Sequence, residues 1–313
     1  MKLILLLMFT IIYANAHSQS RGTQLPQKYN GYGLPNTQFK KINLEAKPNR
    51  PQGASRSEPQ PMEPKKEGLG YSLALDISPT YSIQGEKQTD GSQSQFMYYE
   101  LNPKIEFTTY KIVGAFFYNQ NLIDAKDHDW DDSALNLTRK SFEPFTYLLI
   151  TPFLSYGLPL SKKSREVALL TSTLGTSFVF GLNSKAWGSP ELTLNYSLGY
   201  TKMFSKSNTN AKGESNVDFR IRQRVNFGYA LTDAVSFKMR FEFNSLYNYS
   251  NEISNAFLHY EQIEYKFNDY FGMNLGHTNS GGLFNPETYE NNLKAYDSKS
   301  SEFYLGCTVS LNY

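Results

Sequence analysis

The sequence has one cysteine, Cys307, and no long apolar segment beyond its first residues. A single cysteine excludes an intrachain disulfide, and its apolar neighbours indicate that it packs as a small hydrophobe. The absence of 18 consecutive apolar residues excludes a transmembrane helix. No zinc-ligand spacing and no phosphate-binding glycine loop occurs, so neither a metal nor a cofactor is expected. The formal net charge is only +2, which gives no indication of a nucleic-acid partner.

The first sixteen residues have the pattern of a secretory signal peptide. Lys2 is followed by the apolar run Leu3–Tyr13 and by the small-x-small sequence Ala14-Asn15-Ala16. The run is too short to cross a bilayer as a helix, which makes an uncleaved membrane anchor the weaker alternative. No cysteine follows the run, which argues against a lipoprotein anchor. We therefore expect residues 1–16 to be removed and the mature chain to begin at His17.

Residues 17–67 are polar and contain seven of the 14 prolines. Such a segment cannot bury enough apolar surface to offset the entropy of ordering its backbone. The sequence therefore predicts a proline-rich, disordered tail of the mature protein.

Residues 68–313 alternate between apolar and polar side chains. Clear examples are Leu192–Tyr200 and Val235–Phe243, where every second residue is Leu, Tyr, Phe, Val or Met. A period of two is typical of a strand with one apolar and one polar face. The strands are about ten residues or longer, which suits a tilted membrane crossing. The sequence therefore predicts an all-β fold, a closed antiparallel transmembrane β-barrel, with a soluble β-sandwich as the alternative.

Short and long connections between these strands alternate along the chain, as in outer-membrane barrels. The tight turns are Thr108-Thr109, Thr232-Asp233 and Asn268-Asp269, and the long polar connections are 84–94, 119–132, 205–215, 249–255 and 280–299. Eleven strands are easily identified, and a barrel with both ends on one side needs an even number. Dividing the long segment 133–160 near Glu143-Pro144 gives 12 strands, and the alternatives are 10 and 14.

The C-terminus resembles the terminal signal of bacterial outer-membrane β-barrels. A final aromatic residue is preceded at every second position by an apolar one: Phe303, Leu305, Cys307, Val309, Leu311 and Tyr313. The resemblance implies an outer-membrane location in a Gram-negative-type bacterium, contact with outer-membrane lipid, and recognition by the barrel-assembly machinery through Phe303, Leu305, Val309, Leu311 and Tyr313. It also implies that the tail and the C-terminus are periplasmic.

A row of basic residues is the main candidate for function. Arg220, Arg222 and Arg224 share one face of a strand whose other face carries Phe219, Ile221 and Val225, and the next strand presents Lys238 and Arg240. Charge facing lipid is costly, so this basic ladder is expected to line the lumen. It is similar in kind to the arginine tracks of twelve-stranded channels for acidic sugars. We therefore expect a porin-like channel for small polar, possibly anionic, solutes.

An alternative to an open channel follows from the inward-facing acids Glu100, Glu106, Glu264 and Glu302. They would pair with the ladder inside a closed barrel that serves as a structural or surface-interaction protein. A remote third alternative is an outer-membrane lipid hydrolase, because His277 and Ser280 faintly resemble the catalytic set of lipid A deacylases. Residues three apart lie on opposite faces of a strand, so the nucleophile is misplaced and no enzyme is expected.

The loop from Asp124 to Asp132 is rich in aspartates and could offer oxygen ligands to calcium. It lacks the spacing of a calcium-binding EF-hand loop, and a solvated external loop is the favoured interpretation.

The signal peptide gives a first testable prediction. The precursor is expected to be cut after Ala16, so intact-mass analysis of the protein purified from outer membranes should give a chain that begins at His17. Retention of residues 1–16 in that mass would contradict the prediction. An Ala14→Lys/Ala16→Lys variant, which destroys the small-x-small site, should keep them.

Overall fold

The computed structural model describes residues 71–87, 93–123, 128–184, 186, 188–189, 191–283, 293–297 and 300–312. They form fourteen strands and one short π-helix, η1 (Lys163–Val167). The strands are β1 (Tyr71–Lys87), β2 (Gln93–Phe107), β3 (Tyr110–Asn121), β4 (His128–Trp130), β5 (Ser133–Arg139), β6 (Phe142–Phe145), β7 (Leu148–Leu158), β8 (Leu170–Leu182), β9 (Leu192–Ser205), β10 (Val217–Ala230), β11 (Val235–Asn248), β12 (Ile253–Lys266), β13 (Phe271–Gly282) and β14 (Ser301–Asn312).

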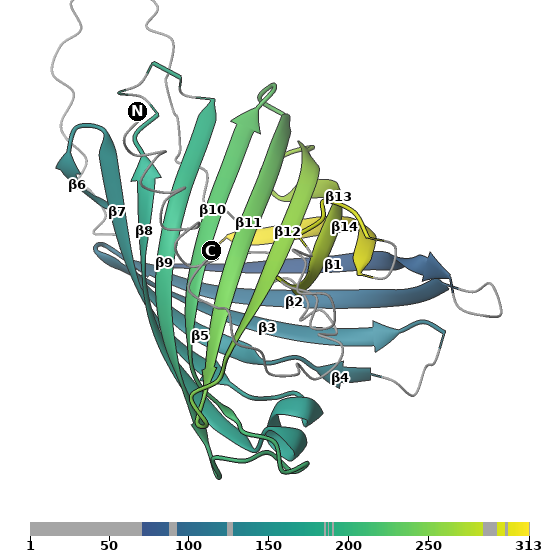
Figure 1. The fold of residues 1–313 in the computed structure, drawn as a ribbon. Coiled ribbons are helices and arrows are strands. Elements are labelled where there is room, and N and C mark those ends of the chain that lie inside the picture. The colour runs from purple at the N-terminus through teal and green to yellow at the C-terminus, as the bar shows by residue number, and fades with distance from the viewer. Residues whose placement is uncertain are drawn as a thin grey trace, which may run out of the picture.

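The strands form one closed antiparallel sheet. Each long strand pairs with its neighbours in the chain, and β1 pairs with β14, so the first and last strands complete the ring. In Figure 1, β9 to β12 run steeply along one wall, and β1 to β3 cross behind them at a large angle. Strands on opposite walls of a closed barrel cross in this way because all of them tilt in the same sense. The predicted closed β-barrel is confirmed.

Fourteen strands make twelve crossings because β4, β5 and β6 are three pieces of one crossing. β4 and β5 both pair with β3, while β5 and β6 both pair with β7. The predicted count of 12 is therefore correct. The division predicted near Glu143-Pro144 falls three residues early, because both residues lie within β6 and the turn is at Thr146-Tyr147. Pro144 is tolerated there because the pairing of β6 with β7 is irregular between Phe142 and Phe145.

The two faces of the sheet differ sharply in polarity. The outward positions carry large exposed apolar side chains, among them Leu101, Leu154, Phe178, Leu198 and Leu275. The inward positions carry buried polar and charged side chains, among them Asp76, Ser78, Asn226, Arg240 and Gln262. In water such an exposed apolar band would aggregate, so this arrangement suits a barrel wall surrounded by lipid.

The two ends of the barrel have connections of different length. At one end the connections 108–109, 146–147, 231–234 and 267–270 are short, and β1 begins and β14 ends there. The connection 183–191 at this end is longer, and within it the backbone N–H of Ala186 donates to the backbone oxygen of Asn183 at 3.1 Å. At the other end lie the long connections, one of which contains η1.

Two expectations fall on residues outside the described part of the chain. The signal peptide and the proline-rich tail both precede Tyr71, where the description begins. Within the described ranges, no helix is long and apolar enough to cross a membrane.

The close packing of β12, β13 and β14 gives a second prediction. A Cβ atom at Gly276 would lie 2.6 Å from the backbone oxygen of Glu261 and would also overlap the ring of Tyr304. The Gly276→Ala variant is therefore expected to lose about 1–3 kcal/mol of stability, because backbone cannot move aside as a side chain can. Thermal unfolding followed by heat-modifiable mobility on gels measures this loss. Gly272→Ala is the control, since its nearest contact is 3.4 Å away; equal stability of the two variants would contradict the packing described.

Candidate functional site in the lumen

The basic ladder lies on the inner face of adjacent strands β10 and β11. Arg220, Arg222 and Arg224 project inward from β10, in register with residues of the polar face of β9, such as Ser197 opposite Arg224. On β11, Arg240 lies opposite Asn226 and Lys238 opposite Gly228. The alternation of β10 places Phe219, Ile221 and Val225 on the lipid side. All five basic side chains therefore share one region of the inner wall.

Two members of the ladder are neutralised by carboxylates on neighbouring strands. Nη2 of Arg224 lies 2.6 Å from Oε2 of Glu242, and Nε of Arg224 donates to the same oxygen at 2.8 Å. Both side chains of this pair are about nine-tenths buried. Nζ of Lys238 lies 2.5 Å from Oε2 of Glu264 on β12. These two pairs hold β10, β11 and β12 together from the inside.

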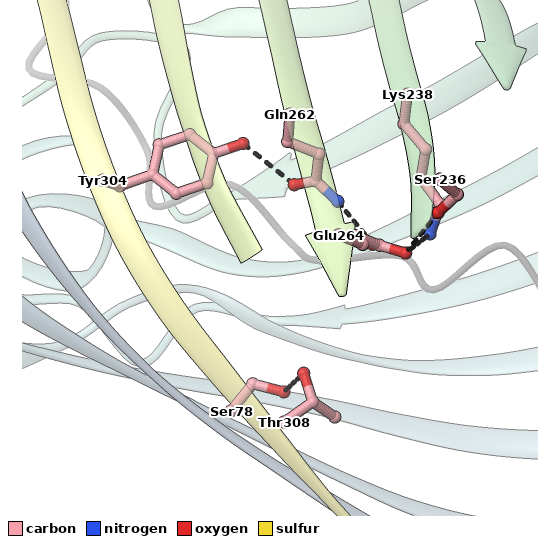
Figure 2. A network of polar contacts seen from close by, with 7 residues as sticks. All are labelled: Ser78, Ser236, Lys238, Gln262, Glu264, Tyr304 and Thr308. Carbon is pink, nitrogen blue, oxygen red and sulfur yellow. Dashed lines mark hydrogen bonds and ion pairs between the residues drawn. The ribbon is translucent and has the colours of Figure 1, made fainter. Parts of the chain in front are cut away.

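The second pair belongs to a longer chain of hydrogen bonds (Figure 2). The hydroxyl of Tyr304 donates to Oε1 of Gln262 at 2.9 Å, and Nε2 of Gln262 donates to Oε1 of Glu264 at 2.5 Å. The hydroxyl of Ser236 donates to Oε2 of Glu264 at 3.4 Å, beside Lys238. This network crosses from β14 to β11 and satisfies polar groups that would otherwise be buried alone.

Arg240 is held by neutral groups. Its side chain is fully buried, its Nε donates to Oδ1 of Asn226 at 2.9 Å, and its guanidinium lies 4.8 Å from the ring centre of Tyr260. Stacking on an aromatic face suits the planar guanidinium and offsets part of its desolvation. Arg240 therefore acts mainly in packing, although its charge still contributes to the field in the lumen.

Arg220 and Arg222 differ from the other three. Neither lies within 4 Å of a carboxylate in the described part of the chain, and both are half-buried. The Nε atom of Arg220 is buried without a hydrogen-bond partner. Glu242 attracts Arg222 as well as Arg224, so this part of the inner wall carries more positive charge than that one carboxylate balances.

The wall next to these arginines is built from small residues. On the inner face of β7, β8 and β9 lie Ser155, Gly175, Ser177, Ser197 and Gly199. A Cβ atom at Gly199 would lie 3.9 Å from Nε of Arg222 and 3.2 Å from Cβ of Ser177, so the guanidinium lies over this glycine. Small side chains leave the ends of Arg220 and Arg222 uncovered on that side.

The inward-facing acids lie in several places. Glu264 joins the ladder as described, and Glu302 accepts a hydrogen bond from Ser82 at 3.3 Å on the β14–β1 wall. Glu100 accepts one from Asn102 at 2.9 Å, and Glu106 lies 3.9 Å from Lys140. Of the four acids considered from sequence, Glu264 is the one that forms an ion pair with a ladder residue in the contacts given above. Glu242 supplies the second carboxylate.

The other sequence motifs have clear positions. His277 faces outward and Ser280 inward, on opposite faces of β13, so they do not form a catalytic pair. The aspartates that the structure describes in the loop accept hydrogen bonds from backbone, amide and hydroxyl groups: Asp129 from the N–H of Lys162, Asp131 from the amide of Asn119, and Asp132 from the hydroxyl of Ser161. No group of metal-ligating side chains is assembled within the described ranges.

In the C-terminal signal, Phe303 and Leu305 are exposed on the outward face, and Val309 and Leu311 follow at the same alternation. Tyr313 lies outside the described residues. Recognition of these residues by the barrel-assembly machinery stays a prediction.

Sequence reasoning missed the roles of Gln262 and Tyr304, which complete the network in Figure 2. Both stand at inward positions of recognisable strands, but a polar inward residue is expected everywhere in such a barrel. The alternation therefore contained no signal that would single them out.

No protein-family model matches the sequence, and no curated protein matches it. Among solved structures, the chain is similar to the NanC porin, with 11% identity, a TM-score of 0.50, and coverage of 76% of this chain and 100% of the porin. It is also similar to an outer-membrane channel from Pseudomonas putida F1 (8% identity, TM-score 0.49, 82% and 100% covered) and to the KdgM porin (10%, 0.41, 75% and 99%). At such identities the likeness shows the fold alone. This chain has the twelve-strand barrel fold of outer-membrane porins.

The buried Arg224–Glu242 pair gives a third prediction. Replacing Glu242 by Leu leaves Arg224 buried without its carboxylate, and we expect a loss of about 3–5 kcal/mol in the free energy of unfolding. The double variant Arg224→Met/Glu242→Leu removes both charges and should recover most of that loss. Urea unfolding followed by tryptophan fluorescence measures both changes. A double variant as unstable as the single one would show that the carboxylate serves some other partner.

Proposed function

We propose that this protein is an outer-membrane porin-like channel for small polar solutes, with a preference for anions. The fold is that of outer-membrane porins, which supports the location and the general role. The observation that carries the preference is the pair Arg220 and Arg222, which face the lumen with no carboxylate within 4 Å among the described residues. Arg224 and Lys238 are neutralised and contribute little net charge to a passing solute.

The proposed anion preference depends on the distance over which an unpaired charge acts. A positive group in water is screened within about 8 Å at physiological ionic strength. In a narrow passage lined by protein, the same charge acts on an ion at closer range and with less screening. Two adjacent guanidinium groups would therefore raise the local concentration of anions and lower that of cations.

The orientation follows from the same proposal. Both ends of the barrel chain, β1 at Tyr71 and β14 at Asn312, lie at the end with short connections. In outer-membrane barrels short turns face the periplasm. We therefore place the tail and the C-terminus in the periplasm, where the assembly machinery would meet the terminal strand during biogenesis.

One observation favours a second candidate, a closed structural or surface-interaction barrel. The inner face of β10 to β14 is densely packed with paired polar side chains, including the Tyr304–Gln262–Glu264–Lys238 chain (Figure 2). Such a network would fill part of the lumen. In that case the long connections at the opposite end, rather than the interior, would carry the function.

Conductance distinguishes these functions and gives a fourth prediction. The purified barrel is expected to form channels in planar bilayers, with a reversal potential that shows anion preference in a salt gradient. Arg220→Gln/Arg222→Gln should shift that potential toward cations, more strongly at low salt, because screening is weaker there. Stability should change little, since the variant loses the attraction between Arg222 and Glu242 but also the repulsion between Arg222 and the neighbouring arginines.

Arg165→Gln is the matched control, because this exposed arginine lies on η1, outside the wall. It should leave the reversal potential unchanged. The absence of any conductance from a folded wild-type barrel would contradict the channel and favour the closed barrel. Conductance with unchanged selectivity in the double variant would contradict the role of the two arginines.

A further inference from the structure

The inner wall near the end with long connections carries charges of opposite sign on opposite sides of the lumen. Between β10 and β2 lie β11, β12, β13, β14 and β1 in one direction, and β9, β8, β7, the β4–β6 crossing and β3 in the other. These two strands are therefore halfway round the ring from each other. Figure 1 shows β10 in the steep wall and β2 in the wall behind it. Side chains at one depth on the two walls face each other across the lumen.

A band of outward aromatic residues marks the depth of these charges. The band comprises Tyr200, Phe219 and Tyr247 on β9 to β11, Phe303 on β14, and Tyr99, Tyr118 and Trp130 on β2 to β4. Such bands lie at the boundary between lipid and water. Arg220 is next to Phe219 and Glu302 is next to Phe303 along the chain, so both inward side chains lie at the depth of this boundary.

The side of the lumen opposite β10 carries two carboxylates, Glu302 and Asp131. Oε2 of Glu302 accepts a hydrogen bond from the hydroxyl of Ser82 at 3.3 Å, and Oδ1 of Asp131 accepts one from Nδ2 of Asn119 at 2.9 Å. Both carboxylates interact electrostatically with Tyr98, which projects inward from β2 opposite Asn119. Among the described residues, no Lys or Arg lies within 4 Å of either carboxylate.

The two sides together produce an electric field across the lumen. Arg220 and Arg222 make the β10 wall positive, and Glu302 and Asp131 make the opposite wall negative. Charged walls of low dielectric focus the field into the water between them. Like charges that share a wall also repel each other, so each wall is stabilised by a solute group of the opposite sign. A solute with charge of only one sign can stabilise only one wall.

We propose that the channel favours zwitterionic solutes, which combine an ammonium and a carboxylate group as free amino acids and short peptides do. This inference rests on the proposed channel and adds a solute class to it. The carboxylate end would face Arg220 and Arg222, and the ammonium end would face Glu302 and Asp131. Salt selectivity reports the sum of the charges along the lumen, whereas this preference depends on their opposite placement at one depth.

The width of the barrel favours a solute whose two charges are well separated. Twelve strands about 4.8 Å apart and tilted by about 40° form a ring roughly 24 Å across between opposite backbones, and the inward side chains narrow this gap. An extended tripeptide is roughly 10 Å long. Its charged ends approach the two walls more closely than those of a single amino acid, so a tripeptide is the sharper probe.

Four peptides with one backbone test the proposal: triglycine, which is zwitterionic, N-acetyltriglycine, which is anionic, triglycine amide, which is cationic, and N-acetyltriglycine amide, which is uncharged. The measurement is the initial rate of uptake of each labelled peptide at neutral pH into proteoliposomes that contain the purified mature protein, with the membrane potential clamped. Triglycine is expected to enter about threefold faster than the uncharged peptide, and faster than the anion.

The failures of this inference and of the channel are distinguishable. An anion that enters as fast as triglycine would overturn the zwitterion preference and leave the channel in place. Uptake of none of the four peptides, together with no conductance in planar bilayers, would contradict the channel itself and the inference with it.

Variants then test the assigned residues. Glu302→Gln/Asp131→Asn removes both negative charges but keeps oxygen acceptors for Ser82 and Asn119, and it should lower the triglycine rate to that of the uncharged peptide without slowing the anion. Arg220→Gln/Arg222→Gln should slow both triglycine and the anion.

Glu166→Gln is the matched control, because this exposed acid lies on η1 and not on the inner wall. It should change none of the four rates. An unchanged triglycine rate in Glu302→Gln/Asp131→Asn would overturn the role of the carboxylates. If that variant does not insert, the four peptides still decide the proposal on the wild-type protein.

Discussion

The pairing of β1 with β14 is the contact on which the rest of the structure depends. In hydrocarbon no water is available to an unpaired backbone group, so a sheet can cross a membrane only if it has no edges. Closure removes both edges at once, and it also creates an interior that lipid cannot reach. Most polar side chains that the strands carry then face that interior or lie near a rim. The segregation of Leu101 and Leu198 outside from Asp76 and Arg240 inside follows from this constraint.

Within the interior, electrostatics sets the arrangement. Burying one ion without a partner is costly, so Arg224 and Lys238 meet carboxylates, and Arg240 meets an amide and an aromatic ring. Arg220 and Arg222 instead lie beside the small residues of β8 and β9, with no carboxylate within 4 Å among the described residues. Arg224 and Lys238 therefore stabilise the wall through their ion pairs, and the proposed anion preference rests on the other two residues.

Much of the fold was predictable from sequence, because lipid imposes the period-two alternation and the alternating segments can be counted as strands. The ion pairs could not be predicted, because they depend on the register between neighbouring strands. A two-residue turn at Thr232-Asp233 would place Arg224 opposite Phe241, whereas the observed pairing of Ala230 with Ser236 places it opposite Glu242. An error of one residue in a turn thus changes every cross-strand partner. The predicted end of the fourth crossing, formed by β4 to β6, was misplaced for a related reason. Pro144 lies at an irregularity within β6 and not at the end of that strand.

The same alternation places a different set of polar side chains on each face of β12. Its even-numbered residues Gln262 and Glu264 belong to the lumen network, while His259 and Glu261 between them face the lipid side. The two sets are separated only by the thickness of the sheet, yet they meet different solvents. The inner set is balanced by Lys238 and Tyr304, and the outer set has an acid half-exposed beside an unpartnered imidazole nitrogen. Hydrogen-bond satisfaction therefore differs between the two faces of this strand, although only the thickness of the sheet separates them.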